Sequence, residues 1–407
     1  MSAPRVNVVI DFTSGATFGY PFIIGQGILG VNTLADAVAD TVDISNQVNK
    51  VSIRRGYNLL QEEFQAGIAT VTLLDPNGDW NPTNPSSPYF GKLVPLRKVR
   101  ISAEEKYLFS GYTTAYNYTW DKEQNIGYVN IELVDAFRLL NMSNITTVTG
   151  ATAGETTGSR VTDILNTIGF PTSMRDIEAG STTVQADPGT SRTSLQAIRN
   201  MEFSEQGGFY FEPSGNAKFI SRLSIQRKSG VNPTFFSNDG TGITYRNIVT
   251  ALDDKLVINT TSITRAGGTA QTASNTASQI KYFPHSYTAT DLLVQTDAQA
   301  LDIAQAYTAT RAETTLRVDA LTLDLNTTDY AAGTTAALTL DFFDTIRVKN
   351  VGQDGTVIDK TLQCMGVVHE ITPGTWNTTF VTSEPIIDSF IIGSSLYGII
   401  GTSVMTY

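Results

Sequence analysis

The sequence predicts a mainly β protein with an α/β insert. Apolar and polar residues alternate along residues 64–110, and this period of two is typical of antiparallel strands that bury one face. Charged residues make up only 16% of the 407 residues, whereas Thr, Ser, Asn and Gly are abundant, which suits strands and turns better than exposed helices. The longer helical patterns are confined to residues 159–205 and about 296–312. The expected order is therefore strands, a helical insert and strands again.

Residues 1 to about 150 are β-rich. An alternating pattern opens the chain at Arg5–Phe12, and Asn77-Gly78 marks a turn after a strand that ends near Leu74. A single helical turn is expected at Asp135–Leu140, before a polar linker over residues 143–158. The further strands expected in this region are 51–55, 68–74, 99–101, 108–120 and 128–134.

Residues 159–222 switch to a mixed α/β pattern. Ser159 is a candidate N-cap for a helix that Gly169 stops, and the pair Gly207-Gly208 ends the second helix. The elements expected here are a helix over about 159–168, a helix from Ser191 or Thr193 to Glu205, and a hairpin that pairs 209–211 with 217–220.

The remaining part of the chain returns to strands. It contains one expected helix, from Thr296 or Asp297 to Ala312, and a strong hairpin turn at Asp354-Gly355. The strands expected after this helix are 316–325, 344–349, 357–362, 365–371 and 378–382.

Residues 386–407 form an apolar C-terminal stretch in which only Asp388 is charged. Polar and glycine residues interrupt it, so it does not supply the roughly 20 apolar residues of a membrane helix, and no membrane anchor is expected. Left exposed on a monomer, such a stretch promotes aggregation. We expect it to be an arm that packs on a neighbouring subunit or another protein, with a disordered end as the alternative.

Composition argues against several classes of function. The net charge is −11, which disfavours binding to nucleic-acid phosphates. Cys364 is the single cysteine, so it closes no internal disulfide, and its expected role is that of a small buried residue. The two histidines, His285 and His369, lie far apart in sequence and predict no zinc site.

No motif predicts catalysis. Adjacent carboxylates such as Glu104-Glu105 point to opposite faces of a strand, and the sequence has no nucleophile elbow, phosphate loop or metalloprotease motif. Residues Asp75 to Asn81 place oxygen ligands at alternate positions, but the glycine and the twelfth residue do not fit a calcium loop, so a polar turn is the preferred interpretation. We therefore expect no enzyme activity, no cofactor and no metal.

A run of aromatic residues leaves two interpretations open. These residues lie mostly at even spacing along one expected ribbon and are Tyr107, Phe109, Tyr112, Tyr116, Tyr118 and Trp120. Such a ladder could stack against sugars, but it more often fills a core and packs across strands, which is the preferred interpretation.

Three groups of motifs, in order along the chain, carry a resemblance to a known family. The first consists of Asp75–Asn81, Asn81–Tyr89, Pro95–Ile101 and Leu108–Gly111. The second consists of Ser194–Ile198, Glu205–Phe211 and Lys218–Arg222, and the third of Gly366–Pro373 with Trp376 and Thr379. Together they resemble the baseplate hub or minor tail proteins at the tail tip of long-tailed, siphovirus-type bacteriophages.

The resemblance implies a fold with two β-barrel domains, similar to the tail tube, that flank smaller α/β domains. The corresponding division of the chain is a first β-barrel domain over residues 1–150, an α/β insert over 151–225, a second β-barrel domain with one helix over 226–385, and the apolar arm over 386–407.

The resemblance also implies a structural role in the virion. Such hubs join the tail tube to the tip and surround the channel through which DNA leaves, which makes a homotrimer the expected state. The implied partners are the distal tail and tail tube proteins, the tape measure protein and central tip or fibre proteins, while DNA passes without specific binding. The residues expected to make assembly contacts are Asn81, Asn84, Pro88, Tyr89, Trp376, Phe390 and Tyr397.

Three alternatives remain open from the sequence. One is a minor tail protein that binds a host receptor or glycan, and another is a distal tail ring protein, which would form a hexamer. The third is a cell-wall hydrolase, for which no additional domain is visible.

Overall fold

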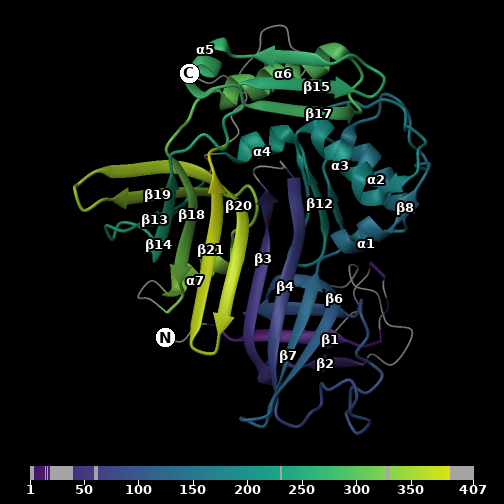
Figure 1. The fold of residues 1–407 in the computed structure, drawn as a ribbon, viewed down its shortest axis with the longest axis vertical. Helices are drawn as coiled ribbons and strands as arrows, with labels where there is room; N and C mark the ends of the chain where they lie inside the picture. The colour runs from purple at the N-terminus through teal and green to yellow at the C-terminus, as the bar shows by residue number, and fades with distance from the viewer. Residues whose placement is uncertain are drawn as a thin grey trace.

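A single large sheet organises the molecule (Figure 1). A computed structural model of the chain describes residues 4–13, 15, 17–18, 40–58, 63–229, 232–326 and 330–385. The sheet has 13 strands, and eleven of them follow one another in space as β14 (Asn247–Ala251), β18 (Arg317–Asp324), β21 (Thr375–Ser383), β20 (Val357–Thr372), β3 (Val48–Asn58), β4 (Glu63–Asp75), β7 (Ile126–Val134), β6 (Lys106–Asp121), β5 (Lys98–Ala103), β1 (Val6–Asp11) and β2 (Thr41–Asp43). The other two, β19 (Thr345–Val351) and β13 (Thr234–Ser237), extend from β20.

The N-terminal and C-terminal β regions join directly within this sheet. Strands β3 and β20 pair antiparallel from Val51 opposite Ile371 to Gly56 opposite Gly366. A Cβ atom added at Gly56 would lie 3.0 Å from the Cα of Gly366, so the two strands leave little room for a side chain at this pair. The two β regions are therefore continuous.

One face of the sheet is covered by the core. Along β4 from Ile68 to Asp75, and along β20 from Val367 to Thr372, buried residues alternate with more exposed ones, as strands with one buried face require. Residues 362–367 of β20 are all buried, and Met365 there packs in the cluster of the insert. One hydrophobic cluster runs through both regions, from Val8 and Trp80 to Trp376 and Phe380. The opposite side of strands β18, β21, β20, β3, β4 and β7, called the outer face below, is visible in the long central strands of Figure 1.

The sheet curves strongly at both sides, because β6 pairs with β5 along its first half and with β7 along its second half. In the same way, β20 pairs with β19 at its start and with β3 towards its end. Among the described residues the strands close into no barrel, so the expectation of two barrel domains is not confirmed. The mainly β class is confirmed, and the proposed domain boundaries stay a prediction.

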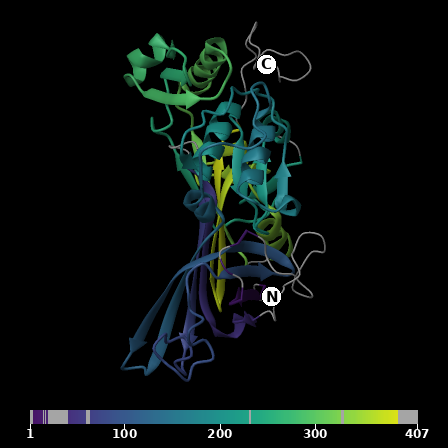
Figure 2. The same cartoon turned by 90° about the vertical axis from the view of Figure 1, so that its right-hand side faces the viewer.

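The helical insert packs beside the upper half of the long strands (Figure 2). A three-stranded sheet of β11 (Gly208–Phe211), β12 (Ala217–Ile220) and β9 (Arg175–Ile177) carries α2 (Thr157–Thr167) and α3 (Ser194–Glu205). Its hydrophobic cluster also contains residues of the main sheet and the loops that join it, including Phe64, Tyr112, Phe343 and Met365. The remaining elements nearby are α1 (Phe137–Met142), β8 (Asn144–Ile145), β10 (Arg192–Thr193) and α4 (Arg222–Lys228).

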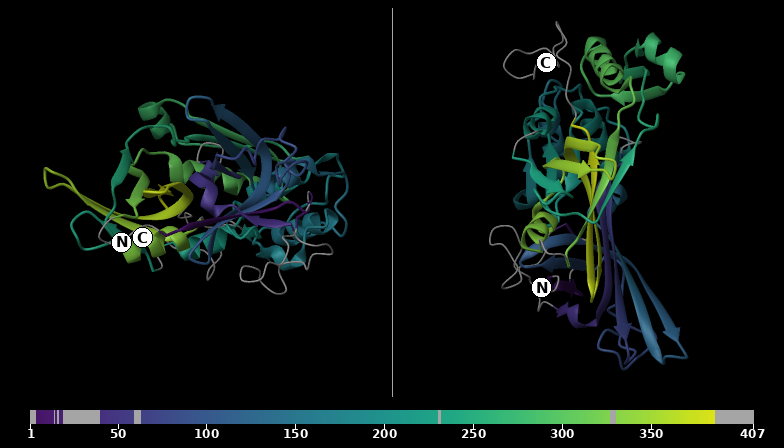
Figure 3. Two further views of the ribbon diagram at one scale, coloured as in Figure 1. Left: turned by 90° about the horizontal axis from the view of Figure 1, so that it is seen from below. Right: turned by 90° about the vertical axis from the view of Figure 1, so that its left-hand side faces the viewer.

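A second small α/β unit lies at the top of the molecule (Figure 3). It consists of β16 (Gln271–Ser274), β15 (Thr260–Arg265) and β17 (Ser286–Leu292), with α6 (Asp297–Arg311) against them and α5 (Thr276–Tyr282) beside them. Its separate hydrophobic cluster includes Ile263, Leu292 and Ile303. The expected helix near 296–312 is therefore confirmed as α6, and it covers this small sheet.

Most predicted elements are present. Thr193 caps α3 as expected. The cap of α2 is Thr156, three residues before the predicted cap Ser159, and its side chain accepts the backbone N–H of Ser159. Asp354-Gly355 forms the β19–β20 hairpin, with Gly355 at a φ of +81°. Three helices were not predicted: α4, α5 and α7 (Tyr330–Thr339).

Candidate assembly surfaces

The outer face of the sheet carries rows of laterally paired side chains that cross from one β region to the other. One row consists of Asp324, Asn377, Glu370, Ser52, Thr70 and Glu132, on six neighbouring strands. Hydrogen bonds link several pairs across the strands: Ser52 donates to Glu370, Thr72 donates to Asn130 at 2.7 Å, and the hydroxyls of Thr322 and Thr379 lie 2.9 Å apart. This row is polar and contains three carboxylates, but the same face also carries Lys50, which lies 3.0 Å from Glu370, and the exposed Arg54, so its charge is mixed.

A buried guanidinium group holds three parts of the molecule together behind this face. Arg55, on β3, donates through Nη2 to the carbonyl of Phe211 in the insert at 2.9 Å. Its Nη1 lies 3.2 Å from Oδ1 of Asp341, and its guanidinium lies 4.7 Å from the ring centre of Phe342. Because Asp341 and Phe342 precede β19, one side chain connects the N-terminal strands, the insert and the C-terminal strands.

Asp135 is a second buried group at this junction. Its carboxylate accepts the N–H of Gly67 at 2.6 Å and that of Phe137, at the start of α1, at 3.0 Å. Burial raises the pKa of Asp135 to about 7, although the two N–H donors and the nearby Arg55 and Arg199 oppose this shift. The contacts of this carboxylate are structural, because they fix the β4 backbone and the first turn of α1.

Residues 76–97, called the lower segment below, follow β4 at the end of the sheet that lies away from the insert (Figure 1). The predicted turn at residues 76–78 is present, with Gly78 at a φ of +75°, but it opens this segment and does not form a hairpin. Strand β4 pairs instead with β3 and β7. The carboxylate of Asp75 accepts the backbone N–H groups of Asp79 and Trp80, so its two oxygen atoms stabilise the turn.

Four predicted assembly residues lie in the lower segment. Asn81 accepts the N–H of Thr83 at 3.0 Å, and Asn84 donates to the carbonyl of Gly78 at 2.9 Å, so both amides order the local turns. Pro88 is exposed, and the partly exposed ring of Tyr89 packs on Trp80, with ring centres 4.6 Å apart.

The most exposed apolar residues of the lower segment were not predicted as contact residues from the sequence. Phe90 is 52% exposed and follows Pro88 by two residues. Val94 is 40% exposed but lies nearer the insert, because its carbonyl accepts a hydrogen bond from Thr113 and Leu96 packs on the insert's cluster. Their only signal in the sequence is that they are apolar residues within a Pro/Asn/Ser-rich stretch.

Trp376 lies elsewhere, in β21, and is fully buried. Its indole Nε1 donates to Nδ1 of His369 at 3.4 Å. Nδ1 of His369 also lies 3.0 Å from the hydroxyl of Thr378. Burial lowers the pKa of His369 to about 3, so the imidazole remains neutral and able to accept the indole N–H. The indole has no exposed surface to offer a neighbour. Phe390 and Tyr397 lie outside the described residues.

The aromatic ladder on β6 belongs mainly to the core. Phe109 and Tyr112 are buried, and Tyr116 and Tyr118 pack against the main hydrophobic cluster. Burial raises the pKa of Tyr116 to about 12. Only Trp120, near the end of the ladder, is substantially exposed, which favours packing over sugar stacking.

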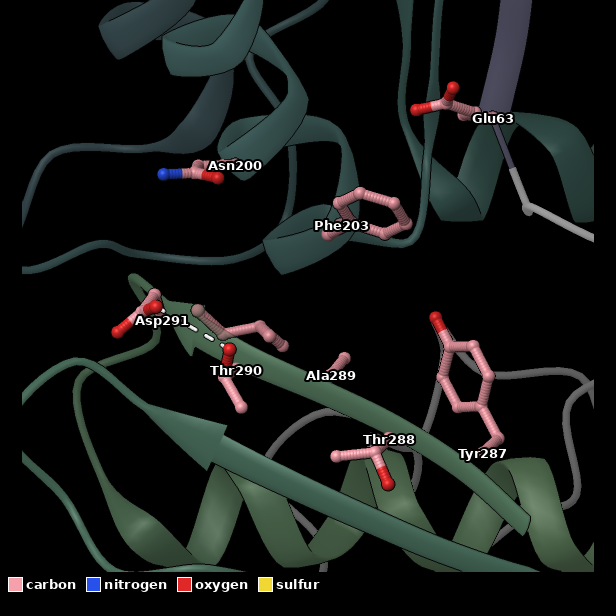
Figure 4. Close-up of a pocket in the computed structure, with 9 residues that line it drawn as sticks. Glu63, Asn200, Phe203, Tyr287, Thr288, Ala289, Thr290 and Asp291 are labelled. Carbon is pink, nitrogen blue, oxygen red and sulfur yellow. Dashed lines mark hydrogen bonds between the residues drawn. The ribbon is translucent and has the colours of Figure 1, made fainter. Parts of the chain in front are cut away.

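The hollow shown in Figure 4 offers no catalytic arrangement. It has a volume of about 420 Å³ and lies between α3, which contributes Asn200 and Phe203, and residues 287–292 of β17. Its two carboxylates, Glu63 and Asp291, lie at opposite ends of the hollow (Figure 4). The lining residues therefore include no nucleophile paired with a base.

Other chemistry is also unsupported within the described part of the chain. No group of three or more His, Cys, Asp or Glu side chains there is arranged to hold a metal ion. Cys364 is fully buried, and burial strongly raises the pKa of its thiol, as expected of an inert packed residue. Among the described helices, none has the length and apolar character needed to cross a membrane.

Comparison with known proteins identifies the fold. No family model and no curated protein matches the chain. Its fold is similar to that of the 43 kDa tail protein of prophage MuSo2 from Shewanella oneidensis, with a TM-score of 0.58 and 10% identity over 94% of this chain and 97% of that one. It is equally similar to the tail protein from Neisseria meningitidis MC58, with a TM-score of 0.58 and 11% identity over 94% of this chain and 98% of that one.

These two structures define the class of fold. The chain has the fold of phage-type tail proteins along almost its whole length. This agrees with the resemblance to tail-tip proteins that the sequence motifs carry.

Proposed function

We propose that the chain is a structural subunit of a phage-type tail tip, a baseplate hub that joins the tail tube to the tip. It assembles as a homotrimer around the channel through which DNA leaves, and it has no enzymatic activity. The support comes from the fold, which two prophage tail proteins share over nearly their full length, and from the order of the sequence motifs.

The observation that carries the proposal is the continuous sheet with its uncovered polar face. The rows of side chains that cross the β3–β20 junction give each subunit one broad wall built from both β regions. On this wall Glu370 pairs with Lys50 and the exposed Arg54 lies on the next row, so the repulsion of DNA rests mainly on the chain's net charge of −11. Like charge repels the phosphates, so such a wall lets DNA pass without binding it.

The two curved halves of the sheet are the counterparts of the two tube-like β units that the family resemblance implies. The N-terminal half contains β1 to β7, and the C-terminal half contains β13, β14 and β18 to β21. Two such units in each of three subunits provide six positions around the axis, which matches the six-fold symmetry of a tail tube. In this proposal neighbouring units complete the wall that a single chain leaves open.

The two ends of the sheet provide the contacts along the axis. The lower segment, with Asn81, Asn84, Pro88 and Tyr89, faces one set of tail partners, and exposed Phe90 adds apolar area to this contact. The proposed partners are distal tail and tail tube proteins, the tape measure protein and central tip or fibre proteins. Tyr397, in the C-terminal arm, is a further proposed contact.

Native mass spectrometry of the purified chain tests this assignment. A mass three times the chain's 44.0 kDa is expected, with Phe90→Ser leaving the trimer intact because this residue faces partners along the axis. A hexamer would favour the distal ring alternative, and a stable monomer at high concentration would contradict the hub assignment.

A further inference from the structure

We propose that residues 386–392 of the C-terminal stretch bind in cis to an apolar patch at the top of the same chain. The patch consists of Leu252, Ile280 and Phe283, which line one hollow of about 450 Å³. Their exposed fractions are 68%, 83% and 81%, the highest of the large apolar side chains in the described residues. Three such exposed apolar side chains around one hollow indicate a surface that binds another apolar segment.

The backbone of Phe283 gives independent support for a role of this patch. Phe283 follows α5 with a φ of +67° and a ψ of 165°, a region of conformational space that is occupied almost only by glycine. The buried side chain of Asn259 fixes this conformation, because it donates to the carbonyl of Phe283 at 2.7 Å and accepts the N–H of His285 at 2.8 Å. Phe283 therefore has a strained backbone conformation, and its aromatic ring is largely exposed to solvent.

The path of the chain leads the C-terminal stretch to this patch. Strands β14 and β21 both pair antiparallel with β18, so they run in the same direction and end at the same end of the sheet. Leu252 directly follows β14. Beyond β21, Glu384 forms an ion pair with Lys360 and accepts a hydrogen bond from Thr315 at 3.3 Å, one residue after Thr314, which lines the hollow.

The last described residue is a proline, which favours an extended conformation for Glu384 before it. The last described residues, Glu384 and Pro385, therefore lie at the end of the sheet where Leu252 and Thr314 also lie. Seven extended residues span up to about 25 Å. Residues 386–392 read IIDSFII, so they supply apolar side chains to match the patch, and Gly393-Ser394-Ser395 separate them from the rest.

Binding within one chain is favoured over binding between copies because the segment is tethered beside the patch. A short tether gives an effective concentration in the millimolar range, far above that of a second copy in dilute solution. The proposal assigns Phe390 to an intramolecular contact and leaves the residues after Ser395, including Tyr397, for neighbouring proteins.

Paired cysteines test the proposal. The variant Ile280→Cys with Phe390→Cys is treated with a short thiol cross-linker at dilute concentration and analysed on a non-reducing denaturing gel. The matched control combines Phe390→Cys with Val357→Cys, which is 56% exposed next to the β19–β20 turn. Native Cys364 is fully buried and does not compete.

An intramolecular cross-link in the first pair, absent from the control pair, is expected. Cross-links that appear only between chains, equal reaction of both pairs, or no cross-link in the first pair would overturn the proposal. The readout does not depend on trimer formation, so its failure is distinct from a failure of the hub assignment.

Truncation after residue 385 gives a second readout. It is expected to increase the fluorescence of a hydrophobic dye several-fold, and Leu252→Ser, Ile280→Ser and Phe283→Ser together should reverse the increase in the truncated chain. An unchanged signal on truncation, or an increase that the three substitutions leave in place, would contradict the proposal.

Discussion

Replacing Arg55 by methionine is expected to lower the free energy of unfolding by about 3 kcal/mol. Methionine has a similar length and keeps the packing against Phe342, but it loses the hydrogen bond to the Phe211 carbonyl and the ion pair with Asp341. Removing one partner of a buried ion pair leaves the other charge without compensation, which typically costs about 3–5 kcal/mol, and the partial exposure of Asp341 reduces this loss. Urea denaturation followed by circular dichroism measures the effect.

The neighbouring arginine provides a matched control. Arg54 lies next in sequence on the same strand but points to the outer face and is exposed. Arg54→Met is expected to change the free energy of unfolding by no more than about 0.5 kcal/mol. Equal effects of the two substitutions would show that Arg55 does not connect the two β regions and the insert. Arg55→Lys should lie between them, since lysine keeps the charge but not the planar arrangement of donors.

Replacing Trp376 by alanine is expected to destabilise the isolated chain by about 3–5 kcal/mol, the usual range for a large buried aromatic residue. The indole is fully buried and its ring meets that of His369 edge-on with centres 6.0 Å apart. The substitution also removes the N–H that donates to Nδ1 of His369. A shift of the thermal unfolding midpoint to lower temperature, measured on the purified chain, checks this.

Trp120 serves as the control for this substitution, because it is a tryptophan at the exposed end of β6. Trp120→Ala should cost less than about 1 kcal/mol. If Trp376→Ala kept the stability of the native sequence and lost only assembly, the residue would be a contact, as the sequence first suggested. Wild-type assembly of a destabilised Trp376→Ala chain would identify it as a core residue.

The strands could be predicted from sequence because their alternation is local. Apolar residues at every second position in β4, β7 and β21 are buried as the pattern indicates, and Asp354-Gly355 forms its hairpin. The pairing of β3 with β20 could not be predicted in this way. It joins residues more than 300 positions apart, and one of its pairs is Gly56 with Gly366, which carry no side-chain signal.

The missed helices have physical explanations. Helix α7 contains Gly333 and several threonines, which have low helix propensity, and it is stabilised by Ala336 and Ala337 packing into the main core. Helices α4 and α5 are seven residues long, too short for a repeating apolar pattern.

The candidate surfaces were only partly visible in the sequence. The motif around Asn81 and Tyr89 directed attention to the lower segment, but motif matching cannot separate exposed from buried residues, and it treated Trp376 as equivalent to Pro88. The outer face was not predicted at all, because its rows of side chains arise from the register of strands from both ends of the chain.

A cryo-electron microscopy reconstruction of the purified assembly would show which surface of the sheet faces the axis. We expect a three-fold ring in which Thr70, Glu370 and Thr379 of the outer face line the lumen, with the core face turned away from the axis. A ring whose lumen is lined by other surfaces, with the outer face buried between subunits or turned to the outside, would contradict this expectation.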